Sequence, residues 1–138
     1  MMHNKKISIG FAGLTHLGII SLVAAADKGF NIIAFDQNKN LIKDLKKNIL
    51  KISEPDLKKY LKKNIDKIYF TSDVKELEKS NFIYLSEDVK TNSSGVSNLL
   101  ELDSLLEYLS IKIDRNIPLI ILSQVPPGYT RIKKSLFV

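Results

Sequence analysis

A short segment with two glycines, Gly13-Leu-Thr-His-Leu-Gly18, follows a predicted strand and opens a predicted helix. Gly13 suits a tight turn, and Gly18 suits close packing of the helix on the strand. Asp36 stands eighteen residues after Gly18, at the end of the next predicted strand. A glycine turn before a helix N-terminus binds pyrophosphate, and an acid at this distance binds ribose hydroxyls. The pattern therefore predicts a dinucleotide-binding site, the alternative being a related domain that has lost its ligand.

Thr15 occupies the middle position of this loop, where glycine normally lets the backbone approach the pyrophosphate. Its Cβ takes up part of that room, and its hydroxyl offers a phosphate a donor in partial return. His16 and Leu17 complete the loop as further candidate cofactor contacts. For His16 the alternative is an ordinary residue at a helix start, which packs or faces solvent.

Asp36 bears on which dinucleotide is bound. A carboxylate there accepts hydrogen bonds from the ribose hydroxyls and repels a 2′-phosphate. The next two residues, Gln37 and Asn38, are not arginines. We therefore expect NAD rather than NADP, with Gln37 beside the ribose. The alternative is that Asp36 only caps the following helix.

Strands alternate with helices along the chain. The predicted strands are 6–12, 31–36, 67–71, 81–86 and 117–122. The predicted helices are 16–28, 38–50, 54–64 (with Ser53 as its cap and Pro55 in its first turn), 73–79, 97–110 and a last stretch after Gly128, with a loop of about ten residues ending near Gly95. This alternation predicts the α/β class: one domain over residues 1–138, with a doubly wound, mostly parallel, Rossmann-like sheet and helices on both faces.

Composition narrows the partners. The chain has 138 residues with 44% hydrophobic and 26% charged residues, which is typical of a globular protein. The apolar run 117–122 is too short to span a bilayer, and residues 1–6 contain no apolar signal region. We therefore expect a cytoplasmic protein with no membrane partner. Cysteine is absent, no two histidines have ligand spacing, and adjacent Glu87 and Asp88 do not form a metal face, so we expect no metal site.

The net charge of +6 comes mostly from residues 43–67, where nine lysines face four acids. A basic stripe is one feature of nucleic-acid binders. Only two arginines occur in the whole chain, and Tyr60 is the single aromatic residue of the stripe. Arginine and stacking aromatics are the groups that read nucleic acids. We therefore interpret the stripe as a solvated helical face and expect no nucleic-acid partner.

The order of several motifs resembles the UDP-glucose/GDP-mannose dehydrogenases in their N-terminal NAD-binding domain. The matching segments are Ile7–Gly18, Lys28–Phe30, Ile33–Asp36, Glu54–Leu57 (the family's EPGL), Phe70–Asp73 (F-T-T-D) and Ser123–Thr130 (S-T-V-P-P-G-T-T). The resemblance implies NAD-dependent, two-step oxidation of a sugar nucleotide's C6 alcohol to a carboxylate, in polysaccharide biosynthesis. It implies NAD contacts by Gly13, Gly18 and Asp36. It also places Ser123 at the carboxyl end of a strand, where ligands bind in open α/β sheets.

Three positions depart from the family pattern: Thr15 in the glycine loop, Gln124 in place of a threonine near the family's catalytic centre, and Val89-Lys90 where Thr-Pro is usual. Lys90 either meets a phosphate or is a solvated loop lysine. Family members run to several hundred residues. Their catalytic cysteine, lysine and sugar-nucleotide domain correspond to positions beyond Val138. We therefore expect this chain to bind NAD without turnover, and to bind a sugar nucleotide only together with that missing part.

Two further expectations concern association. A degenerate Rossmann domain that binds no cofactor and serves as an interaction module is the alternative function, favoured by Thr15, Gln124 and Val89. The strand 117–122 is apolar on both faces and is expected at an edge or beside a poorly covered face. Exposed apolar edges pair with other chains, so we expect a homo-oligomer.

Overall fold

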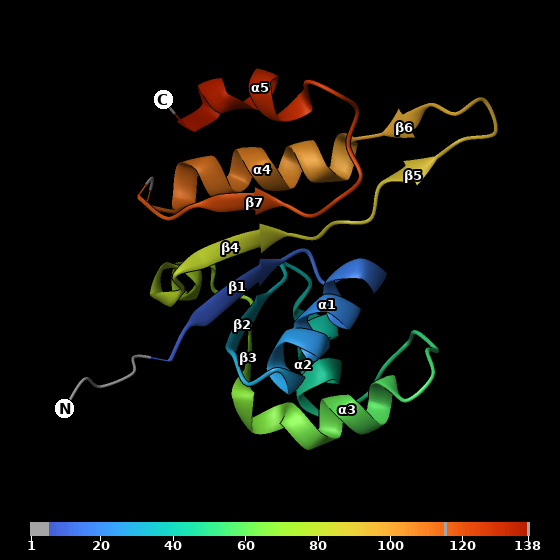
Figure 1. The fold of residues 1–138 in the computed structure, drawn as a ribbon, viewed down its shortest axis with the longest axis vertical. Helices are drawn as coiled ribbons and strands as arrows, with labels where there is room; N and C mark the ends of the chain where they lie inside the picture. The colour runs from blue at the N-terminus through green and yellow to red at the C-terminus, as the bar shows by residue number, and fades with distance from the viewer. Residues whose placement is uncertain (1–5, 115, 138) are drawn as a thin grey trace.

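The computed structural model describes residues 6–114 and 116–137. Five strands form one parallel sheet in the order β3-β2-β1-β4-β7 (Figure 1). The strands are β1 (Ser8–Ala12), β2 (Asn31–Phe35), β3 (Ile68–Thr71), β4 (Phe82–Leu85) and β7 (Leu119–Ile121). The chain winds from β1 outward to β3 and then crosses to β4 on the other side of β1. The predicted doubly wound α/β fold is therefore confirmed, with a switch point between β1 and β4.

Helices cover both faces of the sheet. They are α1 (His16–Asp27), α2 (Lys39–Lys46), α3 (Leu57–Asn64), α4 (Leu100–Lys112) and α5 (Tyr129–Lys133), with 3₁₀ turns η1 (Ile65–Lys67), η2 (Val74–Lys79) and η3 (Lys134–Phe137). Within the described residues, none of these helices has the length and apolar character needed to cross a membrane.

The core lies in two layers because successive strand residues point to opposite faces. Along β2, Ile32 and Ala34 pack with α1, α2 and α3, whereas Ile33 and Phe35 pack with η2, α4 and α5. All four side chains are at least nine-tenths buried. Burial on both faces explains why these strands read as continuous apolar runs.

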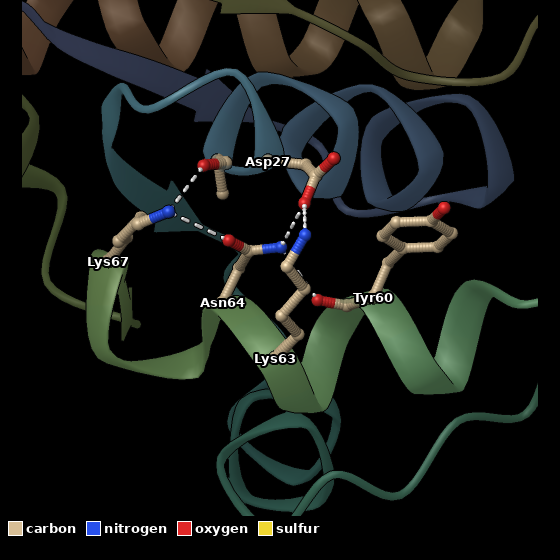
Figure 2. A network of polar contacts seen from close by, with 6 residues as sticks. Asp27, Tyr60, Lys63, Asn64 and Lys67 are labelled. Atoms are coloured by element: carbon tan, nitrogen blue, oxygen red, sulfur yellow. Dashed lines mark hydrogen bonds and ion pairs between the residues drawn. The ribbon is translucent and has the colours of Figure 1, made fainter.

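A polar network joins the end of α1 to α3 (Figure 2). Asp27 Oδ1 accepts hydrogen bonds from Lys63 Nζ and Asn64 Nδ2, each at 2.9 Å. The Asn64 side chain is 1% exposed; its Oδ1 accepts from Lys67 Nζ at 2.9 Å, and Lys67 Nζ also donates to Ala26 O. Asn64 thus fixes the position of α3 against α1.

Several predicted helices differ from the structure. The helix expected over 97–110 spans Leu100–Lys112, and the one expected over 73–79 is the 3₁₀ turn η2 (Val74–Lys79). The helix expected over 38–50 ends at Lys46 because Asn48 adopts a left-handed conformation, with φ at 57°. The helix expected from 54 begins at Leu57 with Asp56 as its N-cap residue at φ 61°, so Ser53 is not its cap. The residue before a proline is disfavoured in the α conformation, which keeps Glu54 outside the helix.

The loop expected to end near Gly95 extends past it as a short antiparallel hairpin, β5 (Lys90–Thr91) and β6 (Ser97–Asn98), and β6 occupies the first residues of the helix expected over 97–110. Asn92 closes its turn: its backbone oxygen accepts from the Gly95 amide, and its Oδ1 accepts from the Ser94 and Val96 amides. An Asn side chain commonly forms hydrogen bonds to the backbone of its own turn. The hairpin was not predicted because each of its strands is only two residues long.

Candidate functional site

The β1–α1 turn depends on both of its glycines. Gly13 has φ at +89°, a conformation open mainly to glycine, and its amide donates to Phe35 O at 3.2 Å. A Cβ on Gly18 would overlap the carbonyl oxygen of Gly13 and would lie 2.7 Å from Ser86 Oγ. The tight turn and the close helix–strand approach predicted for these two residues are therefore present.

Asp36 lies at the carboxyl end of β2 and reaches back to this turn. Its Oδ2 accepts from the Leu14 amide at 2.9 Å, and its Oδ1 accepts from the Asn38 amide at 2.8 Å. The cap of α2 is Asn38, whose Oδ1 accepts from the Asn40 and Leu41 amides. Asp36 is therefore not the cap of α2, and the alternative interpretation of this residue is wrong.

A cavity of about 220 Å³ opens beside Asp36, at the carboxyl ends of β1, β2 and β4. It is lined by Gly13, Phe35, Asp36, Gln37, Glu87, Glu101, Ser104 and Leu105. Gln37 therefore lines the same cavity as Asp36. The cavity lies at the edge of the sheet where ligands of open α/β folds bind.

Three carboxylates gather around the cavity. Burial raises the pKa of Glu87 to about 7, and the charges of Asp36, Glu101 and Asp88 add to that effect. Glu101 comes from the first turn of α4. A Cβ on Gly13 would meet Glu87 Oε2 at 2.7 Å, which shows how closely this side chain approaches the glycine turn. Near neutral pH, Glu87 is therefore only partly ionised, although it lies among other acidic side chains.

The N-terminus of α1 receives a carboxylate from the far half of the chain. Asp88 Oδ2 accepts from the His16 amide and Asp88 Oδ1 accepts from the Leu17 amide, each at 3.1 Å. A helix N-terminus carries partial positive charge and unpaired amides, so an anion there is stabilised. Asp88 supplies that anion from the segment that follows β4.

Thr15 helps to hold this segment in place. Its Oγ1 donates to Ser86 O and accepts from the Asp88 amide, each at 3.0 Å. The hydroxyl proton is therefore directed at a protein carbonyl, not at a phosphate position. Thr15 joins the β1–α1 loop to the end of β4.

The remaining predicted residues lie outside the cavity lining. His16 is exposed, and its Nε2 lies 2.7 Å from Glu54 Oε1, which connects the start of α1 to the segment before α3. Ser123 is 5% exposed and donates to Glu87 O at 2.5 Å. Lys90 is exposed in the β5–β6 hairpin. The Ser123 hydroxyl thus holds the backbone of Glu87 in place through its carbonyl oxygen.

Sequence reasoning missed the roles of Glu87, Asp88 and Glu101. A signal was present, since two consecutive acids directly after an inner parallel strand must lie at the ligand-binding edge of the sheet. The contact with α1 spans 71 and 72 residues of sequence, and no local pattern reveals it.

The chain also matches a known protein family. The model for the NAD-binding domain of the UDP-glucose/GDP-mannose dehydrogenase family matches residues 6–137. The chain belongs to this family. NAD is accordingly the cofactor of this domain.

Individual relatives are full-length enzymes. The UDP-glucose 6-dehydrogenase of Rickettsia bellii is 27% identical over 125 residues, which are 88% of this chain and 29% of the relative. The UDP-N-acetyl-D-mannosamine dehydrogenase of Pyrococcus horikoshii is 28% identical over the same length and shares. The solved UDP-glucose dehydrogenase of Pyrobaculum islandicum has a TM-score of 0.84 at 18% identity, covering 99% of this chain and 33% of that one. The chain thus spans less than a third of these curated relatives.

The site residues fit the two halves of an adenine dinucleotide unequally. The cavity beside Asp36 offers a carboxylate to ribose hydroxyls next to a glycine turn, which suits the adenosine half. The amides of His16 and Leu17, which suit a pyrophosphate, bond the Asp88 carboxylate. The cavity can accept the adenosine half without rearrangement. The pyrophosphate can bind the His16 and Leu17 amides only after Asp88 has moved away from them.

Proposed function

We propose that this chain is the cofactor domain of a nucleotide-sugar 6-dehydrogenase, an enzyme that oxidises the C6 alcohol of a UDP-sugar to a carboxylate. The observation that carries the proposal is Asp36, held at the end of β2 by the Leu14 amide in a cavity beside the Gly13 turn. The family match over residues 6–137 supports it. When bound, NAD would supply the hydride acceptor for each of the two oxidation steps, from alcohol to aldehyde and from aldehyde to carboxylate.

The residues of this chain supply binding and orientation in that reaction. Asp36 and Gln37 receive the adenosine ribose, and Gly13 lets the loop turn beneath the dinucleotide. Gly18 keeps α1 close to the β1–α1 turn, so that the amides of His16 and Leu17 are in reach of the phosphates once Asp88 releases them. The catalytic groups and the sugar-nucleotide contacts come from the larger part of the enzyme, which this chain does not span.

Cofactor choice tests the proposal. Asp36 bears a charge that repels a 2′-phosphate, so calorimetry on the 138-residue chain is expected to give tighter binding of NAD than of NADP. Asp36→Ala narrows the gap, because it removes both the ribose acceptor and the repulsion. Equal affinity for the two cofactors in the unmodified chain contradicts the role given to Asp36.

The second candidate is an interaction module that binds no dinucleotide. The observation in its favour is Asp88, which takes the place of a phosphate at α1.

A self-association surface at β7 suits either candidate, and we propose a homo-oligomer. The family resemblance supports a cytoplasmic setting and a place in polysaccharide biosynthesis.

A further inference from the structure

The α1 N-terminus is capped by a side chain that is remote in sequence. Thr15, the N-cap residue, makes no side-chain bond to the helix, and the first turn of α1 contains no acid. The two oxygens of Asp88 instead take one amide each, from His16 and Leu17. The first-turn amides of the glycine loop are the groups that bind pyrophosphate in dinucleotide sites.

One pair of amides cannot serve two anions at once. A pyrophosphate oxygen on the His16 amide and Asp88 Oδ2 on the same amide are mutually exclusive. The approaching phosphate also meets the negative charge of Asp88 at close range, in a region where Asp36 and Glu101 are acidic as well. Dinucleotide binding therefore includes the displacement of Asp88.

We propose that Asp88 is a resident anion that competes with the pyrophosphate, so that its displacement sets the affinity of this chain for dinucleotides. The inference rests on the proposed function, because it assumes that the β1–α1 loop receives NAD. It assigns Asp88 a role in specificity. The residue lowers the affinity for ligands that carry a pyrophosphate and does not change the affinity for ligands that occupy only the Asp36 cavity.

The surrounding contacts hold Asp88 in its competing position. The Asp88 amide donates to Thr15 Oγ1, Thr15 donates to Ser86 O, and Ser123 donates to Glu87 O. The backbone on both sides of Glu87 is thus fixed to β1–α1 and to the end of β7. The Asp88 carboxylate itself is held on α1 by two hydrogen bonds from backbone amides, each at 3.1 Å. The side chain can therefore leave while the backbone stays in place.

The test compares two ligands on three proteins by calorimetry. The ligands are NAD and adenosine, and the proteins are the unmodified 138-residue chain, Asp88→Asn and Asp66→Asn. Asn is itself a good N-cap residue, so Asp88→Asn removes the charge and keeps an acceptor for α1. Asp66 is the matched control: it is an exposed acid before β3, at the opposite end of the strands from the site.

We expect Asp88→Asn to bind NAD about tenfold more tightly than the unmodified chain, a factor that corresponds to about 1.4 kcal/mol. Adenosine affinity stays unchanged in all three proteins, and Asp66→Asn behaves as the unmodified chain with both ligands. Equal NAD affinity in the unmodified chain and Asp88→Asn overturns the inference, as does weaker binding to the variant. If neither ligand binds any of the proteins, the proposed function falls together with it.

A second measurement requires no variant of Asp88. Inorganic pyrophosphate is titrated into the ¹³C,¹⁵N-labelled unmodified chain, and the amide signals of His16 and Leu17 are followed together with the side-chain carboxyl ¹³C signal of Asp88. Competition predicts that these two signals respond only at pyrophosphate concentrations at which the Asp88 signal moves with them. A response of His16 and Leu17 while Asp88 stays unchanged shows that both anions are accommodated and overturns the inference.

Discussion

At the residue scale, the site is a balance of charges rather than a set of isolated contacts. Asp36 faces the same cavity as Glu87 and Glu101, and Asp88 lies next to Glu87 in sequence. Among the four acids near this glycine turn, the carboxylate that is most strongly desolvated takes up a proton first as the pH falls. That group is Glu87, with its pKa raised to about 7.

Glu87 makes stability depend on pH. Because its pKa rises from 4.5 in the ordinary state to about 7 in the fold, the folded chain binds this proton more tightly than the unfolded chain does. The free energy of unfolding therefore falls as pH rises from 4.5 to 7 and is then constant for this group. Glu87→Gln removes the loss, and we expect it to stabilise the chain at pH 8 by about 1–2 kcal/mol, a figure discounted for solvent screening of a half-buried carboxyl.

Urea unfolding of both proteins at pH 5 and pH 8 checks this prediction. The difference between variant and unmodified chain is the quantity to compare, because Asp27 and Asp103 have lowered pKa values and act in the opposite direction. Asp66→Asn provides the control for loss of one acid. A difference that is the same at both pH values contradicts the pKa assigned to Glu87.

At the scale of elements, α1 and α3 are joined by a polar contact as well as by an apolar one. Asn64 is buried and bonds Asp27 on α1, the Tyr60 carbonyl on its own helix, and Lys67 beyond it (Figure 2). Buried polar groups left without partners are unfavourable. Asn64 therefore adds a buried polar contact to the apolar packing of α3 on α1.

Asn64→Ala tests this contact. The substitution leaves Asp27 and Lys67 without their shared partner, and we expect the free energy of unfolding to fall by about 1–3 kcal/mol. The urea midpoint decreases while the slope of the transition stays constant, since the surface exposed on unfolding is unchanged. Lys63→Ala, which removes only the exposed ion pair to Asp27, is expected to change the midpoint little. Equal effects of the two substitutions would show that Asn64 is not the joining group.

Element type was predictable from the sequence, whereas element length and the partners of each end were not. The apolar runs 31–36 and 81–86 predicted β2 and β4 because both are buried on two faces. The ends of α2 and α3 were misplaced because Asn48 and Asp56 adopt left-handed conformations that their residue types only permit.

At the scale of the whole molecule, the sheet has an unpaired edge. Within the described residues, β7 pairs only with β4. Ile120 and Leu122 are more than a third exposed there. A cavity of about 470 Å³, lined in part by Leu119, Ile121 and Phe137, opens beside the strand. The edge position expected for the strand 117–122 is present within the described residues; Ile120 and Leu122 are partly exposed there, whereas Leu119 and Ile121 pack against the core.

We expect the 138-residue chain to self-associate through this edge, because exposed apolar strands pair with other chains. Sedimentation over a wide concentration range should give an average mass that rises with concentration. Ile120→Lys places a charge on the edge and is expected to keep the chain monomeric. A chain that remains monomeric at high concentration contradicts the use of β7 as a contact, and an unchanged association in the variant places the contact elsewhere.

The capping of α1 by Asp88 also constrains the order in which the chain can fold. β1, α1, β2 and β3 are close together in sequence, and closing short loops is entropically easier than closing long ones. The bonds of Thr15 with Ser86 and Asp88 span 71 and 73 residues, so they form only after β4 has joined β1. We therefore expect helix α1 to form against the sheet before its N-terminus is capped. A nascent chain that has not yet reached residue 88 would then expose the anion site that Asp88 later occupies.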